Sequence, residues 1–155
     1  MKYEDWLAAV PVELREDALW QMKVYPMAVF AGDLAWADVG KLWANKRLWG
    51  LSDQLYRAIG SVGANIAEGY SRQSGKEQAH FYEYALGSAR EARHWYHQAR
   101  HTLRPEVVAH RMGLLTEIIR LLLTIIPKER SRAAREPATN YNALPCHLLD
   151  DPPMP

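Results

Sequence analysis

Histidines are the residues of this chain whose spacing most directly suggests chemistry. His94, His97 and His101 recur at i, i+3 and i+7, which places all three on one face of a helix. Imidazole nitrogens are common ligands of zinc and nickel. However, positions i and i+7 lie about 10 Å apart along a helix, and Arg93 and Arg100 would repel a cation. We therefore expect no metal here and interpret the histidines as part of a polar helix surface.

Two Glu-x-x-His pairs raise a second possibility, because di-iron bundles use this motif. The pairs are Glu77 with His80 and Glu91 with His94. A di-iron site needs its two pairs on different helices, meeting at the same depth. Here both pairs fall on one predicted helix, about 20 Å apart. The spacing therefore argues against a di-iron centre.

The remaining candidates for catalysis are also weak. Cys146 and His147 are adjacent in a proline-rich stretch with no third partner to orient the histidine. Glycine-rich phosphate loops and nucleophile elbows are missing from the sequence. We expect a protein that is not an enzyme and that binds no cofactor.

Polar side chains form another candidate site around the central helix–helix connection. Five of them recur at steps of four, four, three and four, along one side of a helix. They are Arg57, Ser61, Asn65, Glu68 and Arg72, and Ser88 and Glu91 join them from the next helix. An arginine–carboxylate pair across the two helices would fix their register. We predict a structural network, with a ligand-binding site as the alternative.

Positive charge is concentrated in the second half of the chain, although the whole chain has a net charge of only +1. Residues 90–135 hold ten Lys and Arg against four Glu, a net charge of +6. Aromatic rings mixed with cations are typical of proteins that hold single-stranded nucleic acid. Trp95 and Tyr96 supply rings here, with a place in the core as the alternative, favoured for Trp95. The predicted RNA or DNA contacts are Arg93, Arg100, Arg104, Arg111, Lys128, Arg130, Arg132 and Arg135.

Apolar periodicity predicts the elements that position these residues. Residues 1–22 form an N-terminal arm, in which Tyr3, Trp6, Leu7 and Val10 mark a short amphipathic helix that must dock on another element. Residues 23–132 form an all-α, up-down-up-down four-helix bundle. Residues 133–155, rich in proline, form an irregular C-terminal tail that is flexible or docked.

The bundle helices are expected at about 23–42, 51–69, 75–102 and 105–127. Gly69 fits a helix terminus that needs a left-handed residue, and Ser74 with Glu77 forms a capping box. Gly60 and Gly63 inside the second helix indicate close approach of a neighbouring backbone. The fourth helix is apolar on two faces, so we expect it to pack against the bundle and against another subunit.

The segments RAIGSVGANIAEGYSR at 57–72 and FYEYALGSAREAR at 81–93 together carry a family resemblance. They resemble the four-helix-bundle proteins encoded in intervening sequences of 23S ribosomal RNA. The matching motif positions are Arg57, Asn65, Glu68, Gly69, Arg72, Gly87, Ser88 and Glu91.

The resemblance implies a homopentamer. Relatives include the accessory proteins of diversity-generating retroelements, which bind a reverse transcriptase and RNA. Our leading hypothesis is an oligomeric nucleic-acid-binding protein. The alternative is a protein-binding accessory or scaffold module, for example for a reverse transcriptase.

Composition points to the cytoplasm as the expected compartment. Cys146 is the only cysteine, so no internal disulfide is possible. The longest strongly apolar run, at 121–126, is too short to cross a bilayer, and the N-terminus lacks a signal-peptide pattern. We therefore expect no membrane partner.

Overall fold

The computed structural model describes residues 3–132, and this part of the chain is built from helices and their connections. The short elements come first: α1 (Tyr3–Ala9), α2 (Val12–Arg15) and the 3-10 helix η1 (Ala18–Gln21). The long helices follow, with a second 3-10 helix between the first two: α3 (Val24–Leu42), η2 (Lys46–Leu48), α4 (Trp49–Tyr70), α5 (Gly75–Ala99) and α6 (Pro105–Arg130). The predicted all-α class is confirmed.

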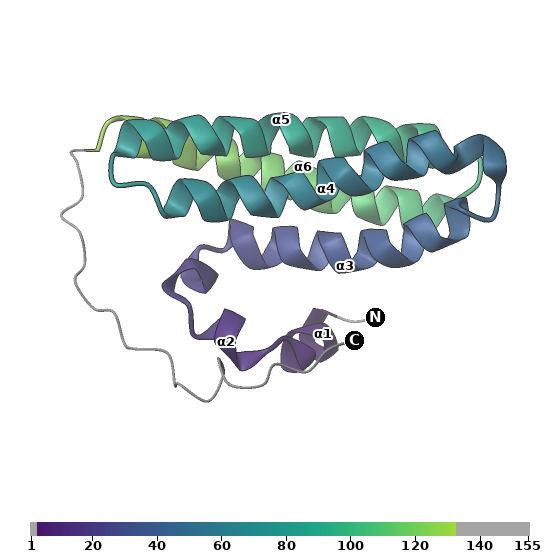
Figure 1. Cartoon of the computed structure of the whole chain (residues 1–155), viewed down its shortest axis with the longest axis horizontal. Coiled ribbons are helices and arrows are strands. Elements are labelled where there is room, and N and C mark those ends of the chain that lie inside the picture. The colour runs from purple at the N-terminus through teal and green to yellow at the C-terminus, as the bar shows by residue number, and fades with distance from the viewer. Residues whose placement is uncertain (1–2, 133–155) are drawn as a thin grey trace, which may run out of the picture.

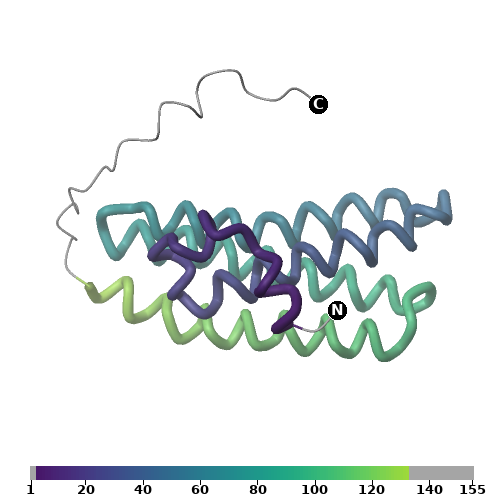
Figure 2. The backbone as a smooth tube through the Cα atoms, turned by 90° about the horizontal axis from the view of Figure 1, so that it is seen from below, coloured from purple at the N-terminus to yellow at the C-terminus, as the bar shows by residue number. Residues whose placement is uncertain are grey.

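The four long helices run alternately up and down and form one bundle (Figure 1). Each helix packs against the next along the chain, and the first, α3, also packs against the last, α6. The α3–α4 and α5–α6 connections therefore lie at one end of the bundle, and the α4–α5 connection lies at the other with the end of α6. The view from below shows the same antiparallel order (Figure 2).

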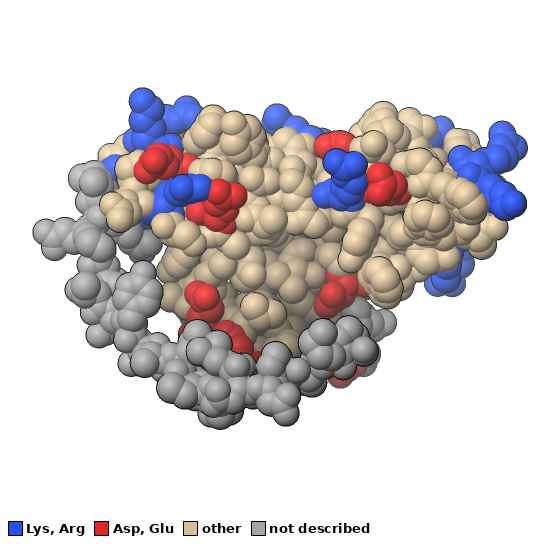
Figure 3. Space-filling view, in the orientation of Figure 1, with Lys and Arg blue, Asp and Glu red and all other residues tan. Residues whose placement is uncertain are grey.

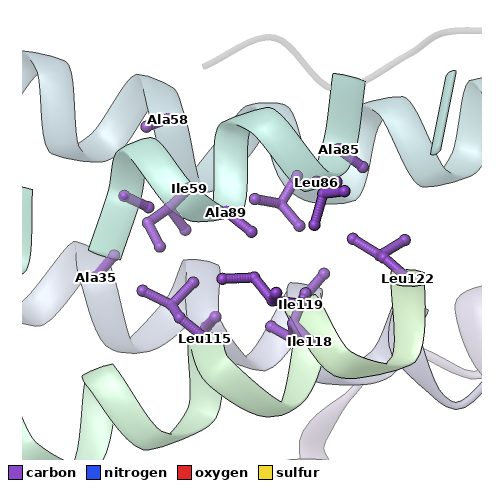
Figure 4. Packing of buried hydrophobic residues seen from close by; sticks show 14 of the residues in the cluster. Ala35, Ala58, Ile59, Ala85, Leu86, Ala89, Leu115, Ile118, Ile119 and Leu122 are labelled. Carbon is purple, nitrogen blue, oxygen red and sulfur yellow. The ribbon is translucent and has the colours of Figure 1, made fainter. Parts of the chain in front are cut away.

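Small residues on α5 let its neighbours approach closely. Half of its buried residues are alanine, and Ala79, Ala85, Ala89 and Ala92 are all fully enclosed. The facing side of α6 supplies the bulk through larger residues such as Leu115 and Ile118. Figure 4 shows the alanines of α5 facing the leucine and isoleucine side chains of α6. Small and large side chains thus alternate across the core, as dense packing requires.

The N-terminal arm docks on its own chain, as its amphipathic pattern predicts. Trp6 is buried against Phe30 of α3, with ring centroids 4.9 Å apart. Its indole Nε1 donates a hydrogen bond to Asp33 Oδ2 at 2.6 Å. Leu114 of α6 packs against the same cluster, which also contains Leu34. Part of the second apolar face of α6 is therefore covered within the chain rather than by another subunit.

Gly69 is required for a reason that differs from the predicted one. It lies inside α4, which continues to Tyr70 and ends with Ser71 in a right-handed conformation, so no left-handed residue is needed. Instead, a Cβ atom on Gly69 would lie 2.7 Å from Cε1 of Tyr82 and 2.9 Å from Cβ of Phe81. The glycine permits close approach of α4 and α5.

Gly75 serves the same purpose between α5 and α6. A Cβ atom there would lie 2.1 Å from the carbonyl oxygen of Glu129. The predicted close approach at Gly60 and Gly63 does not occur within the described part of the chain. Gly60 has no neighbour within 4 Å of its Cβ position, and Gly63 meets only Ala28 Cβ at 3.9 Å. Both lie instead along an open groove between α3 and α4.

Other local predictions are largely confirmed. Ser74 Oγ accepts a hydrogen bond from the Glu77 N–H at 3.2 Å and so caps α5. Pro105 occupies the first turn of α6. The helix continues past Pro127 to Arg130, although Pro127 has no N–H to donate to the carbonyl oxygen one turn earlier.

Two further expectations concern membrane spans and the C-terminal tail. Among residues 3–132, no helix has the length and apolarity needed to cross a membrane. The predicted tail at 133–155, which includes Arg135 and Cys146, lies outside the described residues.

The packing at Gly69 gives a first testable prediction. Gly69→Ala should lower the free energy of unfolding by about 1–3 kcal/mol, because the added methyl overpacks the α4–α5 contact. Gly113→Ala in α6 is the matched control, because no atom lies within 4 Å of its Cβ position. That control should be neutral or should stabilise by about 0.5–1 kcal/mol. Urea unfolding measures both, and equal effects of the two variants would contradict the packing argument.

Candidate functional site

A buried ionic cluster joins three of the four bundle helices. Asp38 of α3 is only 5% exposed, yet it carries a carboxylate in the core. Tyr96 of α5 donates its hydroxyl hydrogen to Asp38 Oδ2 at 2.9 Å. Arg111 of α6 donates from Nε to Oδ2 at 2.7 Å and from Nη2 to Oδ1 at 3.2 Å. The carboxylate therefore meets a bidentate guanidinium and a phenol.

The surroundings of the cluster shift the pKa values of two of its groups, Tyr96 and His110. Burial, reinforced by the charge of Asp38, raises the pKa of Tyr96 well above its ordinary value, so its hydroxyl remains a donor. Burial and the nearby Arg111 charge lower the pKa of His110. Neutral His110 can then accept a hydrogen bond at Nδ1 from Arg111 Nη1, which lies 3.0 Å away. The donors and acceptors of the cluster satisfy one another, so its role is structural.

Arg111 therefore does not lie on the predicted nucleic-acid surface. Its side chain is only 14% exposed and its guanidinium is engaged by Asp38. The cluster itself was missed because Asp38 looks unremarkable in the sequence. The available signal was a single acid within the apolar stripe of α3, between Leu34 and Leu42.

The predicted polar network around the central turn does not assemble within one chain. Each member binds a neighbour on its own helix, one turn away. The pairs are Arg57 with Asp53, Asn65 with Ser61, Arg72 with Glu68, Ser88 with the Tyr84 carbonyl oxygen, and Glu91 with Trp95 Nε1. Arg57 is in addition about four turns away from Arg72 along α4. The expected arginine–carboxylate pair across the hairpin is thus absent from residues 3–132.

Two other contacts set the register of the α4–α5 hairpin. Gln78 is almost fully buried, and its Nε2 donates to the Arg72 carbonyl oxygen at 2.7 Å. The Arg72 guanidinium also lies over the Phe81 ring, 4.5 Å from its centroid. A cation over an aromatic face is attracted by the ring quadrupole. The hairpin is held by an amide and a ring rather than by a salt bridge.

The predicted basic group at the end of α6 is largely neutralised. Arg130 pairs with Glu83 of α5, and Arg132 Nη1 lies 2.9 Å from Glu129 Oε2. Arg72, at the same end of the bundle, pairs with Glu68. Lys76 and Lys128 are exposed and have no acidic partner among the described residues. Among residues 3–132, Arg72, Arg130 and Arg132 at this end therefore each have an acidic partner, whereas Lys76 and Lys128 do not.

The opposite end of the bundle is different. Lys41, Lys46 and Arg47 surround the α3–α4 connection, are exposed, and have no acidic partner within residues 3–132. Arg100, beside the α5–α6 connection, donates only to the His97 carbonyl oxygen, at 2.7 Å. Arg104 nearby pairs with Glu106 at 2.9 Å. Figure 3 shows Lys and Arg gathered at this end, where α3 leads into α4. We call Lys41, Lys46, Arg47 and Arg100 the basic end.

Sequence reasoning missed most of the basic end because it counted charge by segment. Lys41, Lys46 and Arg47 belong to the first half of the chain, whose acids outnumber its bases. Only the antiparallel topology brings their connection to the same end as Arg100. Arg93 is excluded from this surface, because it lies half-buried along α5 and its Nη1 contacts Thr116 Oγ1 at 3.4 Å.

The histidine face remains a polar surface. His94, His97 and His101 are exposed, and the His94 ring packs against the Trp95 ring at 5.0 Å. Trp95 is partly buried against the core and Tyr96 is fully buried. Within residues 3–132, no group of three or more His, Cys, Asp or Glu side chains is placed to hold a metal ion.

These features describe a four-helix bundle with an apolar core, one buried ion-pair cluster and exposed charges at both ends. The chain belongs to the 23S rRNA-intervening sequence protein family, whose model matches residues 21–124. The family resemblance found in the sequence is therefore confirmed.

One solved structure shares this fold. It is a crystal structure from Bacteroides thetaiotaomicron, described as a protein of unknown function from the S23 ribosomal protein family. Its sequence is 26% identical, and the alignment covers 66% of this chain and 97% of that chain with a TM-score of 0.63. No protein with a curated description matches this chain. The comparisons indicate no enzymatic family.

The buried cluster yields the second prediction. Asp38→Ala should reduce the free energy of unfolding by about 3–5 kcal/mol, because Arg111 would remain buried without a counter-charge. Glu68→Ala is the control, since the Arg72–Glu68 pair is about half exposed. Such an exposed pair contributes about 0.3–0.5 kcal/mol. Chemical denaturation compares the two, and a larger loss for Glu68→Ala would assign the stabilising network to the central turn instead.

Proposed function

We propose that this protein is a non-enzymatic, oligomeric nucleic-acid-binding protein that contacts RNA or DNA through the basic end. The observation that carries the proposal is the unequal pairing of charge at the two ends of the bundle. Lys41, Lys46, Arg47 and Arg100 have no acidic partner within residues 3–132. The arginines at the other end, Arg72, Arg130 and Arg132, each have one.

Unpaired cations are what a phosphate backbone requires. Each phosphate neutralised by Lys or Arg releases condensed counterions, which favours binding at low salt. A cation already paired with a carboxylate must first lose that partner. The basic end is therefore the surface best suited to a polyanion.

Exposed aromatic and small residues on α3 and α4 support the oligomeric part of the proposal. Trp36 is 70% exposed, and its ring lies 5.8 Å from that of Tyr56. The groove that holds Gly60 and Gly63 lies between the same two helices. A large apolar surface of this kind is typical of a protein interface. We infer that another copy of the chain packs here, in a ring of five by the family resemblance.

Oligomerisation gives the third prediction. Native mass spectrometry at micromolar concentration should show an assembly, most simply a pentamer. Trp36→Ser should shift the distribution toward monomer, while circular dichroism should show unchanged helix content because Trp36 is not part of the core. A wild-type protein that is only monomeric would contradict the proposal, and the α3–α4 surface would then favour a different protein partner, such as a reverse transcriptase.

Nucleic-acid binding gives the fourth prediction. A triple variant with Lys46, Arg47 and Arg100 changed to Ala should bind mixed-sequence RNA or DNA more weakly than wild type at about 50 mM salt. The slope of log affinity against log salt should also flatten by about 0.7–0.9 for each phosphate that the variant no longer neutralises. Fluorescence anisotropy across a salt series measures both quantities.

The paired cations at the other end supply the control. A double variant, Arg130→Ala with Arg132→Ala, removes two positive charges from residues that already have acidic partners. It should leave affinity and salt slope near the wild-type values. Stronger loss in this control than in the triple variant would place the binding surface at the end of α6 instead. No binding by the wild-type assembly would remove the nucleic-acid function altogether and leave the scaffold alternative.

A further inference from the structure

Two exposed tryptophans lie within the basic end. Trp43 follows α3 and Trp49 begins α4, and they are 49% and 44% exposed. Their ring centroids are 5.5 Å apart, with 35° between the ring planes. Large aromatic side chains are usually buried because each removes considerable apolar area from water. Two of them left in contact at the tip of a bundle therefore form a surface available to a partner.

Local hydrogen bonds orient the Trp49 ring and cap the short helix that carries the adjacent cations. Trp49 Nε1 donates a hydrogen bond to the Trp43 carbonyl oxygen at 3.0 Å, which orients its indole. Asn45 Oδ1 accepts from the Arg47 N–H at 3.1 Å and caps the short η2 helix. Lys46 and Arg47 lie in η2, between the two tryptophans in the chain. Rings and charges are thus part of one connection only seven residues long, at 43–49.

We propose that this connection binds single-stranded nucleic acid, with bases stacking on Trp43 and Trp49 and phosphates bound by Lys46 and Arg47. The inference rests on the proposed function. It adds that the ligand is single-stranded rather than double-stranded, and it names the residues that favour a single strand. Bases of any identity offer a flat face to an indole, so stacking together with nearby cations binds single strands with little sequence preference.

Selectivity for a single strand follows from the same geometry. In a duplex the base faces are stacked on one another and cannot reach a protein ring without unstacking. A duplex would contact only the cations of the basic end. A single strand would contact both the cations and the rings. The tryptophans should therefore contribute to the binding of single strands but not to the binding of duplexes.

Charge argues against the same end of a second copy as the partner of these two rings. Lys41, Lys46 and Arg47 have no acidic partner within residues 3–132. The same end of a second copy would bring three more unpaired cations, and like charges repel. A polyanion instead satisfies the cations while it covers the rings.

The test compares three labelled probes on the full-length protein: a short unstructured RNA, the same sequence as DNA, and the corresponding duplex. Trp43→Ala and Trp49→Ala should each weaken single-strand binding by roughly 5- to 150-fold, the range expected when one base–aromatic stack is removed. Duplex binding should stay unchanged, and so should the salt slope for single strands. Trp43→Phe should recover much of the affinity because the ring returns.

Cross-linking locates the binding residues independently. A single strand that carries 5-iodouracil should cross-link to Trp43 or Trp49 on irradiation, and mass spectrometry of the peptides identifies the residue. Preference for RNA over DNA would identify RNA as the ligand, and equal affinity would mean that both single strands use the site.

The outcomes separate this inference from the proposed function. Salt-dependent binding that does not discriminate single strand from duplex, and that survives both Ala substitutions, would overturn the stacking site while leaving the basic end as a binding surface. No binding of any probe would remove both. If Trp43→Ala or Trp49→Ala dissociates the assembly in native mass spectrometry, the rings are a subunit contact and the stacking inference fails.

Discussion

The neutralisation of one buried carboxylate is the constraint on which the rest of this bundle depends. Asp38 is paired in the core with Arg111 and Tyr96, and an unpaired buried charge there would be strongly unfavourable. An apolar stripe tolerates a slip or rotation of one helix at modest cost, whereas a bidentate ion pair does not. The cluster therefore selects one register for α3, α5 and α6. That register also determines which residues of α6 face the surface.

Features that are determined within a single segment of the chain could be predicted from the sequence, whereas features that depend on contacts between segments could not. Helix positions, the Ser74 cap and the docking of Trp6 follow from spacing along a single segment, and these predictions hold. Asp38 and Gly69 required knowledge of which side chains lie across the core, which single-segment periodicity does not contain. The basic end was missed for a related reason: Lys46 and Arg100 are distant in sequence, and only the folded topology brings them to the same end of the bundle.

The two ends of the bundle illustrate why a count of charges is a poor guide to function. Arg130 and Arg132 looked like ligand contacts because basic residues crowd the end of α6, yet each has an acidic partner. Lys46 and Arg47 lie in a half of the chain whose net charge is slightly negative. At the proposed binding surface, the cations have no local counter-charge within the described structure and lie beside the exposed rings of Trp43 and Trp49.

The docked arm has a consequence for how copies of this chain can meet. The family match begins at residue 21, so the arm is an addition to the shared bundle. Trp6 and its neighbours occupy the side of α3 that carries Phe30 and Leu34, while another side of the same helix faces the core. The arm thus acts as a built-in steric block on one flank of α3. Any symmetric packing of copies through this helix is directed to the flank of Trp36, and a relative without such an arm would have two flanks from which to choose.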